Sequence, residues 1–391
     1  MALPFICYNI AFNFKPVIMI KKALTIFPVF VSGLIITLIS ACNCNTDSQK
    51  AGEDISVLLE YSVPSERLEN APPNFFGRPE EYLEWEAEGL LHLVEETLSR
   101  FPPGVSEPIV RHMALHMLDA VFHDVDAPHR PAVQEFHHRR AALALEEMRR
   151  TRVDEGAMIW KLYNMGFVVR TATVTVGFDL TSGYTSRSDD FALTDDLMKA
   201  IVEQCDVLFI SHFHGDHAEE SVARAFLDLN KPVIAPAQVW AGLPIHDEIT
   251  HLGRAAHKPH ILPVKSGEYE LQVIVYPGHQ GSQIQNNVTL VITPEGLSFC
   301  HTGDQSFPDD FEWIDQVSEH FKVDVLMPNC WTTDPPRTSR GYDPRLIIPG
   351  HENELGHSID HREAYALNYS RWDVPYPKII MTWGESYYYK P

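Results

Sequence analysis

The chain contains little cysteine and comparatively few basic residues. Only six of its 391 residues are cysteine, too few and too scattered for the disulfide framework of a small secreted domain. Cys205, Cys300 and Cys330 lie in or beside apolar stretches, which predicts buried thiols. Lysine and arginine total 31 against 53 acidic residues, a formal net charge of −22. Because nucleic-acid binding requires basic residues that neutralise phosphates, we expect no nucleic-acid partner and favour a small-molecule one.

Long hydrophobic runs are nearly absent, and the exception is a charge-free stretch at residues 23–39. Two lysines precede it and Ser-Ala-Cys follows, which is the pattern of a bacterial lipoprotein signal peptide. We therefore expect residues 1–41 to be the signal, Cys42 to carry a lipid, and residues 42–55 to form a linker. An uncleaved anchor is the alternative, because the run approaches the roughly 20 residues that span a bilayer. Both interpretations predict a bacterial cell-envelope protein, anchored to the membrane and facing outside the cytoplasm.

Residues 56–157 show the periodicity of helices. Apolar side chains recur every three or four positions, which predicts helices from Pro79 up to Pro102, over 109–121 and over 131–150. This helical region could cap the mouth of an active site or brace the fold from a distance, and we favour the cap.

Three side-chain pairs in the helical region are not expected to form a site. His112 and His116 stand four residues apart and could be half of a metal site, but no third ligand is evident, so a packed or exposed pair is expected. The histidine pair at 137–138 is predicted to lie on a solvated helix face. The phenylalanine pair at 75–76 is predicted to lie in the core.

From residue 158 the pattern changes, and residues 158–391 are expected to form one domain. β-Branched and aromatic residues predict strands near 159–169, 171–179, 207–210, 232–235, 272–276, 288–293, 323–327, 345–348 and 378–382. Helical patterns alternate with them at 194–204, 218–229, 311–321 and 358–368. The alternation predicts an α/β fold in which two sheets are sandwiched between helices.

The predicted strand at 207–210 leads into a cluster of metal-binding residue types: His212, His214, Asp216 and His217. Imidazole and carboxylate are the groups that hold Zn²⁺ or non-haem iron. Residues two apart in an extended segment project the same way, so the first two histidines can converge on one ion. The aspartate and the third histidine, beyond a glycine, face a second position. Two metals so placed can share a water and lower its pKa, so the pattern indicates a metal centre rather than a histidine-rich surface loop.

This His-x-His-x-Asp-His motif resembles the hallmark of the metallo-β-lactamase superfamily. The resemblance implies three further ligands, each on an apolar run beside a glycine turn, and His279, Asp304 and His351 occur in the order it requires. It also implies the αββα sandwich of the metallo-β-lactamase type for residues 158–391, preceded by the helical N-terminal segment. The context of the motif is most similar to the lactonase and phospholipase-D-like branch.

Carried over residue by residue, the resemblance implies two metal positions. His212, His214 and His279 would hold one ion, Asp216, His217 and His351 would hold the other, and Asp304 would bridge the two. The cofactors would be two divalent metal ions, with zinc favoured and manganese or iron as alternatives. Asp216 would also orient the nucleophile or shuttle its proton.

Some of these assignments have alternatives. His357 could replace His351 as the last ligand. His301 is a candidate catalytic residue, as an acid or as a group that orients a ligand or the substrate. Tyr342 and His357 are further candidate acids. Four other histidines are expected to be solvated or to line the pocket rather than to bind metal: His246, His251, His257 and His260.

The resemblance implies a metal-dependent hydrolase in which a bridging hydroxide attacks an ester, lactone or phosphodiester of a small molecule. One alternative is a mononuclear iron sulfur dioxygenase, and another is a surface lipoprotein that binds a ligand on an inert site. Asp304 argues against antibiotic hydrolysis, because true β-lactamases of this fold usually have a cysteine ligand or none at that place.

Overall fold

The structure is a computed structural model that describes residue 71 and residues 74–183 and 191–391. All of these residues lie in one compact unit. The predicted signal peptide, the linker and the start of the helical region lie outside the described residues, so the membrane anchor stays a prediction. None of the described helices is long and apolar enough to cross a membrane.

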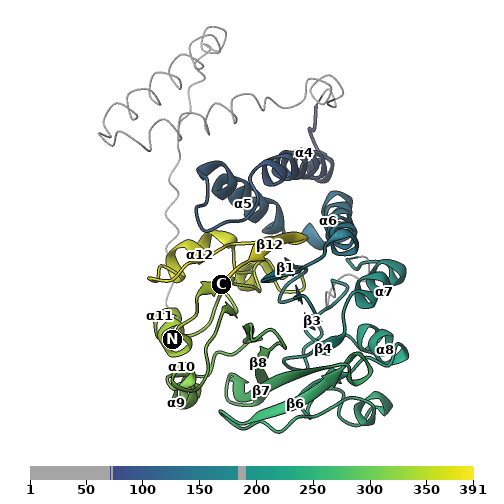
Figure 1. The fold of residues 1–391 in the computed structure, drawn as a ribbon. Helices are drawn as coiled ribbons and strands as arrows, with labels where there is room; N and C mark the ends of the chain where they lie inside the picture. The colour runs from purple at the N-terminus through teal and green to yellow at the C-terminus, as the bar shows by residue number, and fades with distance from the viewer. Residues whose placement is uncertain (1–70, 72–73, 184–190) are drawn as a thin grey trace, which may run out of the picture. The chain divides into compact units, whose positions relative to one another are not determined.

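Two six-stranded sheets form the centre of the fold (Figure 1). The first has the order β12 (Glu385–Tyr389), β1 (Ala157–Lys161), β2 (Phe167–Arg170), β3 (Thr175–Phe178), β4 (Val207–Phe209), β5 (Val233–Ile234). The second has the order β11 (Leu346–Ile347), β10 (Val325–Met327), β9 (Ser298–His301), β8 (Ile284–Ile292), β7 (Tyr269–Gln280), β6 (Pro259–Val264). Strands β3, β4 and β5 are parallel to one another, as are β9, β10 and β11.

The two sheets pack face to face and bury a common core. Phe178 and Phe209 of the first sheet meet Val275, Phe299 and Met327 of the second. Burial of a side chain of this size stabilises the fold by about 1.5–3 kcal/mol. Successive strand residues point to opposite faces, so a strand covered on both sides needs a continuous apolar sequence, as β4 has.

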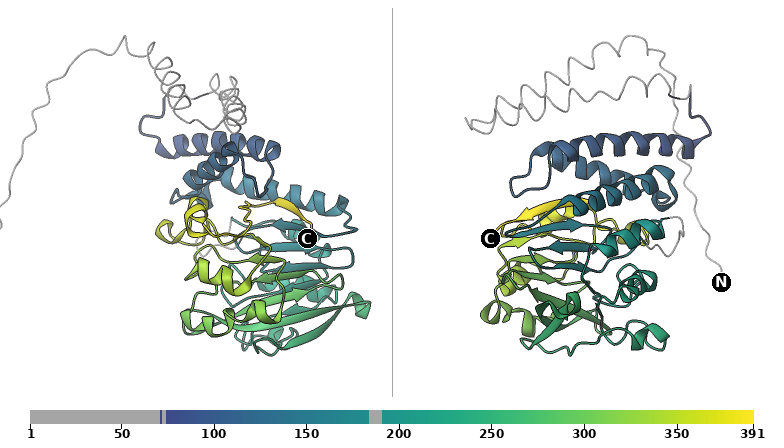
Figure 2. Two further views of the ribbon diagram at one scale, coloured as in Figure 1. Left: turned by 60° about the vertical axis from the view of Figure 1, so that its left-hand side comes forward. Right: turned by 45° about the vertical axis from the view of Figure 1, so that its right-hand side comes forward.

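Helices cover the outer face of each sheet (Figure 2). On the first sheet these are α6 (Pro131–Arg150), α7 (Asp195–Glu203) and α8 (Glu220–Asp228). On the second they are α9 (Phe311–Ile314), α10 (Val317–His320) and α11 (Pro335–Tyr342). The αββα sandwich predicted from the sequence is therefore confirmed.

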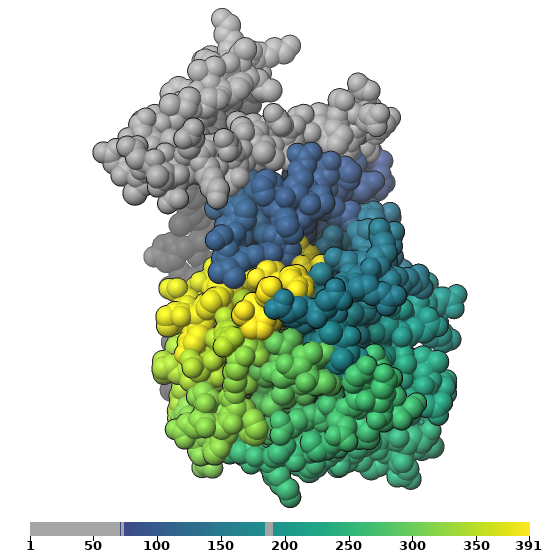
Figure 3. Space-filling model, viewed as in Figure 1, coloured from purple at the N-terminus to yellow at the C-terminus, as the bar shows by residue number. Residues whose placement is uncertain are grey.

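The predicted N-terminal helices are confirmed and pack against the C-terminal part of the chain. Helices α4 (Pro79–Arg100), α5 (Ile109–Phe122) and α6 share a core with α12 (Tyr365–Arg371) and the segment after it. Within this core the rings of Phe122 and Trp383 stack at 4.5 Å. Figure 3 shows the blue atoms of the helical region directly against the yellow C-terminal atoms. An ion pair from Arg111 Nη2 to Glu385 Oε2, 2.6 Å long and buried, ties the two parts together.

Several elements differ from the sequence-based prediction. Residues 378–382 form no strand, and only Lys378 makes a β-bridge, to Ile347. The helix expected at 358–368 begins only at Tyr365, after a short 3-10 turn. Strands β6 and β12 were not predicted, because prolines interrupt the first and the second is rich in tyrosine without an apolar run. Pairing with a neighbouring strand, which a local pattern does not report, decides these cases.

Two predictions about side chains in the helical region are wrong. His137 is buried rather than solvated, because its ring stacks on Phe191 at 4.7 Å beside Trp383, and burial lowers its pKa to about 3. Phe76 is 94% exposed rather than in the core. Cys205, Cys300 and Cys330 are buried free thiols, as predicted.

Candidate metal centre

The sandwich brings the ends of several distant strands to one edge. The segment with His212 to His217 follows β4, the loop with Asp304 follows β9, and His351 follows β11. Gly303 allows two of these loops to touch. Its φ is +51°, and a Cβ there would lie 2.3 Å from Ser211 Cβ, so only glycine fits this turn.

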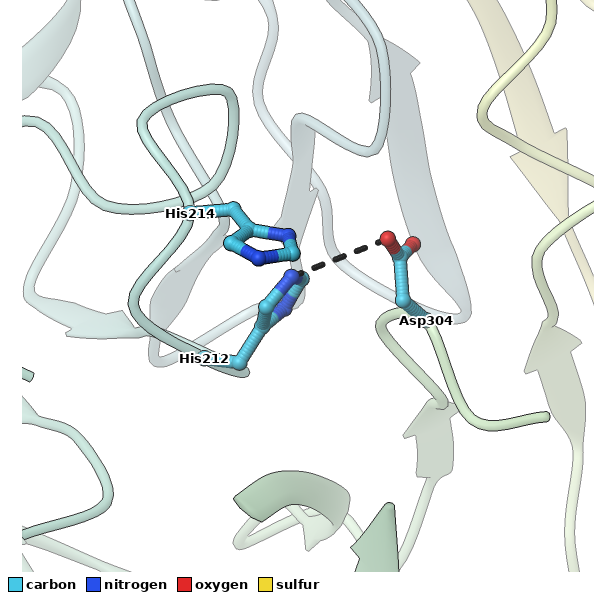
Figure 4. A group of neighbouring side chains, drawn as sticks. All are labelled: His212, His214 and Asp304. Atoms are coloured by element: carbon cyan, nitrogen blue, oxygen red, sulfur yellow. Dashed lines mark ion pairs between the residues drawn. The ribbon is translucent and has the colours of Figure 1, made fainter. Parts of the chain in front are cut away.

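The first ligand group contains His212, His214 and Asp304, whose donor atoms all lie within 4.8 Å of one another. Figure 4 shows the two imidazoles on one loop and the carboxylate reaching toward them from another. The distance from His212 Nε2 to Asp304 Oδ2 is 3.6 Å. His212 and Asp304 are buried, and His214 is partly exposed, so this group opens to solvent on one side.

The second ligand group contains Asp216, His217 and His351, again with donor atoms within 4.8 Å of one another. Asp216 Oδ2 lies 3.1 Å from His217 Nε2 and 3.4 Å from His351 Nε2. The other oxygen of Asp304, Oδ1, lies 3.3 Å from His217 Nε2 and 3.4 Å from His351 Nε2. One carboxylate therefore faces both groups, with one oxygen toward each.

The donor set fits metal ions. Within the described part of the chain, four buried atoms at this point have no hydrogen-bond partner: the Nε2 atoms of His212, His217 and His351, and Oδ1 of Asp304. Leaving such atoms unpaired costs about 1–3 kcal/mol each, and divalent cations would satisfy all four. Imidazole and carboxylate suit zinc, manganese and iron alike.

Neighbouring side chains hold the opposite nitrogens of the imidazoles. Ser211 Oγ lies 3.0 Å from His212 Nδ1, and Asp179 Oδ2 lies 2.8 Å from His217 Nδ1. Asp179 also accepts hydrogen bonds from the Ser211 backbone N–H and hydroxyl, at 2.7 Å and 2.6 Å. Such contacts fix the ring orientation and leave Nε2 for a metal.

The pKa values separate the two groups. Burial lowers the pKa of His212 to about 3, and burial also lowers the pKa of His214, so both imidazoles are neutral and ready to bind a cation. Burial opposes charge on His351, but the carboxylates of Asp304 and Asp216 outweigh it and raise the pKa to about 10. The pKa of His217 is likewise raised, by Asp216 and Asp304 against burial. Without a cation, protons on these two imidazoles balance the carboxylates.

Six of the seven predicted ligands thus lie in two adjacent groups, and the seventh, His279, lies beside them. The backbone carbonyl of His279 accepts a hydrogen bond from Ser306 N at 2.9 Å, and the next residue, Gln280, donates to Asp304 Oδ2 at 3.1 Å. His279 Nδ1 is 2.8 Å from Asp310 Oδ1, so its Nε2 is the nitrogen left for a metal. His279 belongs to neither group of three, and its role as a ligand stays a prediction.

The candidate acids are in three different environments. His301 is buried, with Nε2 3.0 Å from the Met165 carbonyl and Nδ1 accepting from Gly303 N at 3.3 Å. Its catalytic role stays a prediction, and this placement favours the orienting alternative. Tyr342 is buried in the core behind the second sheet. His357 is 45% exposed at its side chain, and its ring lies 5.8 Å from that of His351.

The remaining histidines with a predicted role lie outside both ligand groups. His246, His251 and His260 each bond a loop carbonyl, and the His257 ring packs on that of His320 at 3.9 Å. The Nε2 atoms of His112 and His116 are 2.9 Å apart, but no third ligand joins them among the described residues.

Three residues that contact predicted ligands were not predicted from the sequence: Asn164, Asp179 and Asp310. Asp179 carried a signal, because a carboxylate that closes an apolar strand parallel to β4 must reach the same sheet edge as His212. Asn164 escaped because residues 159–169 were predicted as one strand but form β1, a turn that contains Asn164, and β2. Asp310 ends a short 3-10 helix, where Asp is common for local reasons, so no signal marked it.

No family model and no curated protein matches the chain. Among solved structures it is similar to Igni18, a metallo hydrolase from Ignicoccus hospitalis, with 14% identity and a TM-score of 0.45 over 60% of this chain and 99% of that one. A protein of the metallo-β-lactamase superfamily from Thermotoga maritima matches with 17% identity and a TM-score of 0.29 over 50% of this chain and 76% of that one. CmlA, a diiron β-hydroxylase from Streptomyces venezuelae, matches with 13% identity and a TM-score of 0.44 over 61% of this chain and 55% of that one.

One fold hosts many reactions, so the chemistry has to be inferred from the site rather than from these neighbours. The chain itself shows two six-stranded sheets with flanking helices and two clusters of histidine and aspartate that suit metal ions.

Proposed function

We propose that the protein is a binuclear metal-dependent hydrolase that cleaves an ester, lactone or phosphodiester bond in a small molecule. The observation that carries the proposal is the shared carboxylate of Asp304. One of its oxygens faces His212 at 3.6 Å, and the other faces His217 at 3.3 Å and His351 at 3.4 Å. A single carboxylate with one oxygen toward each ligand group suits a pair of cations.

Divalent cations in these positions would supply a water of lowered pKa and a Lewis acid for the substrate oxygen. The residues of the chain orient the ligands and transfer the proton. Ser211 and Asp179 keep His212 and His217 oriented before any cation or substrate arrives, so little reorganisation is needed. The Asp216 side chain is 12% exposed, against 2% for Asp304, so we assign to Asp216 the orientation of the nucleophile and the transfer of its proton.

The exposed side of the site favours a small, partly apolar substrate. Phe213 is 43% exposed, and its ring lies 4.9 Å from that of His214. The ring of Trp331 lies 5.7 Å from that of His351, close to the half-exposed His357. Aromatic side chains next to a metal centre suit the organic part of a small molecule. The net charge of −22 would repel a polymer of phosphates.

Metal analysis by plasma mass spectrometry, together with turnover of generic esters, lactones and bis(p-nitrophenyl) phosphate, tests the proposal. We expect two zinc or manganese ions per chain and loss of turnover in His214→Ala. His260→Ala is the matched control, because its ring bonds the Gly253 carbonyl at 2.9 Å outside both ligand groups, and it should keep wild-type turnover. Equal turnover by His214→Ala and wild type would contradict a metal hydrolase, and a single iron per chain would favour the dioxygenase.

We also propose that a lipid on Cys42 anchors the protein in the bacterial cell envelope. The support comes from the sequence alone, in which two lysines, a charge-free apolar run and Ser-Ala-Cys follow one another. Mass spectrometry of the wild-type protein should find residue 42 lipid-modified at the N-terminus of the mature chain, and Cys42→Ser should lack this modification. Mass spectrometry of the wild-type protein that found residue 42 unmodified inside the mature chain would refute the anchor.

A further inference from the structure

Asn164 contacts two of the three residues of the second ligand group, Asp216 and His351, although it is not one of the predicted ligands. It lies in the turn between β1 and β2, far in sequence from Asp216 and His351. Its side-chain Nδ2 donates to Asp216 Oδ2 at 2.9 Å and approaches the Asp216 carbonyl at 3.3 Å. Its backbone carbonyl accepts a hydrogen bond from His351 N at 3.3 Å.

The loop that carries His351 needs such support from outside. His351 itself has a φ of +73°, and Asn353 a φ of +51°, so both hold a backbone conformation that non-glycine residues seldom adopt. Contacts with other elements stabilise this shape: Lys161 pairs with Glu352, and Asn353 Nδ2 donates to Asp119 Oδ1 of α5 at 2.9 Å. These two contacts involve the residues that follow His351, whereas Asn164 contacts the predicted ligands His351 and Asp216 directly.

A purely local role does not account for Asn164. The turn needs its φ of +53°, which asparagine tolerates and glycine tolerates better. The side chain is nevertheless fully buried, and its amide points at a metal-binding carboxylate. A buried amide donor on a carboxylate oxygen sets which way that carboxylate faces, as partners outside a ligand set commonly do for metal sites.

We propose that Asn164 is a positioning residue that builds the second metal position by fixing Asp216 relative to His351. The inference rests on the proposed binuclear centre. Removing the amide should weaken metal binding at the group of Asp216, His217 and His351 while leaving the group of His212 and His214 intact. The expected loss is about 10–100-fold in metal affinity, the usual effect of removing such a partner.

Two substitutions distinguish the effect of losing the Asn164 amide from the effect of disturbing the turn. Asn164→Gly keeps the left-handed backbone and the carbonyl that binds His351 N, and removes only the amide. Asn164→Asp keeps the shape and places an oxygen against Asp216 Oδ2 in place of the donor. Asn230→Asp is the matched control, because Asn230 has a φ of +54° and is exposed after α8.

The measurement is a zinc titration of the metal-free protein against a chromophoric chelator, with unfolding midpoints recorded in parallel. In a His214→Ala background, which retains the second group, Asn164→Gly should weaken the remaining binding step about 10–100-fold. In a His351→Ala background, which retains the first group, the same substitution should leave the remaining step unchanged.

Unchanged zinc affinity of both Asn164 variants in the His214→Ala background would overturn the inference, and so would equal weakening in both backgrounds. Wild-type protein that binds no zinc, manganese or iron would overturn the proposed binuclear centre itself. These results differ, so the failure of the inference and the failure of the proposed function can be told apart.

Discussion

Replacing Asp179 with asparagine should change which nitrogen of His217 carries a proton. Asp179 Oδ1 accepts from the Ser211 backbone N–H at 2.7 Å, so the oxygen of an asparagine has to stay at that place. Its NH₂ group then replaces Oδ2, which now accepts from His217 Nδ1 at 2.8 Å. Because an amide nitrogen only donates, His217 Nδ1 must become the acceptor, and the neutral imidazole must then carry its one proton at Nε2. Nε2 is the atom that faces Asp216 and Asp304, and once protonated it can no longer bind a metal.

The structure sets the size of the effect. Wrong orientation or tautomer of one ligand costs about 10–100-fold in metal affinity, which is about 1.4–2.8 kcal/mol. Loss of hydrogen bonds to a buried charged group costs the metal-free fold about 1.5–3 kcal/mol. Asparagine tolerates the φ of +41° at position 179, so backbone strain adds little. We expect weaker zinc binding in a chelator titration. In ¹⁵N spectra of the metal-free proteins, His217 of Asp179→Asn should carry a proton at Nε2 and none at Nδ1, whereas wild-type His217 should carry protons at both nitrogens.

Asp324→Asn is a closely matched control. Asp324 is also buried and also accepts from a serine backbone N–H and hydroxyl, those of Ser298, both at 3.0 Å. It precedes β10, at the opposite end of the sheet from Asp304. Asp324→Asn should therefore destabilise the fold without weakening zinc binding. Equal zinc affinity in Asp179→Asn and wild type, or equal loss in both variants, would refute the tautomer argument.

Three further predictions concern stability. Burial raises the pKa of Glu107, with Tyr369 and Arg111 opposing, so the folded chain holds this proton more tightly than the unfolded chain and stability falls as pH rises from 4.5 through the folded pKa. Glu107→Gln, which still accepts from the Tyr369 hydroxyl, should increase the free energy of unfolding relative to wild type at pH 7 but not at pH 4. Urea denaturation of both proteins at the two pH values measures this. The same difference in free energy of unfolding between variant and wild type at pH 7 and at pH 4 would count against it. Arg111→Ala leaves Glu385 buried without its partner and should cost about 3–5 kcal/mol, whereas Arg337→Ala removes an exposed pair with Asp315 and should change little. Removing metal with a chelator should lower the urea midpoint of unfolding, because a cation at 100 times its dissociation constant stabilises the fold by about 2.7 kcal/mol. Zinc added back should restore the midpoint. Identical midpoints with and without zinc would argue against a metal centre.

The ligand residues were visible in the sequence because each one follows a local pattern. An apolar strand, a glycine turn and a histidine or aspartate occur together at His212, Asp304 and His351, and strand ends are where parallel sheets place functional groups. The helices α4, α5 and α6 were predicted for a similar reason, since a 3.6-residue period needs only neighbouring residues. The fold class followed from the alternation of these two periods.

Side chains that act through contacts between distant segments escaped prediction. Asn164 lies in a stretch that was predicted to be a continuous strand, and nothing near it in the sequence indicates that its amide meets Asp216, 52 positions later. His137 lies on the buried face of α6, four residues from Val133 and from Ala141, and Phe191 and Trp383 cover its ring. Strand β12 has no apolar run, and its pairing with β1 alone makes it a strand.

The amino-acid sequence by itself determined which groups could bind metal, because ligand chemistry belongs to the side chain and strand ends can be read from local periodicity. The resemblance of the motif implied how those groups divide into two clusters around Asp304. Only the tertiary structure decided which nitrogen of His217 stays free and that α5 supports the loop of His351. Those outcomes depend on distances between residues that are far apart along the chain, and such distances exist only after the two sheets have packed.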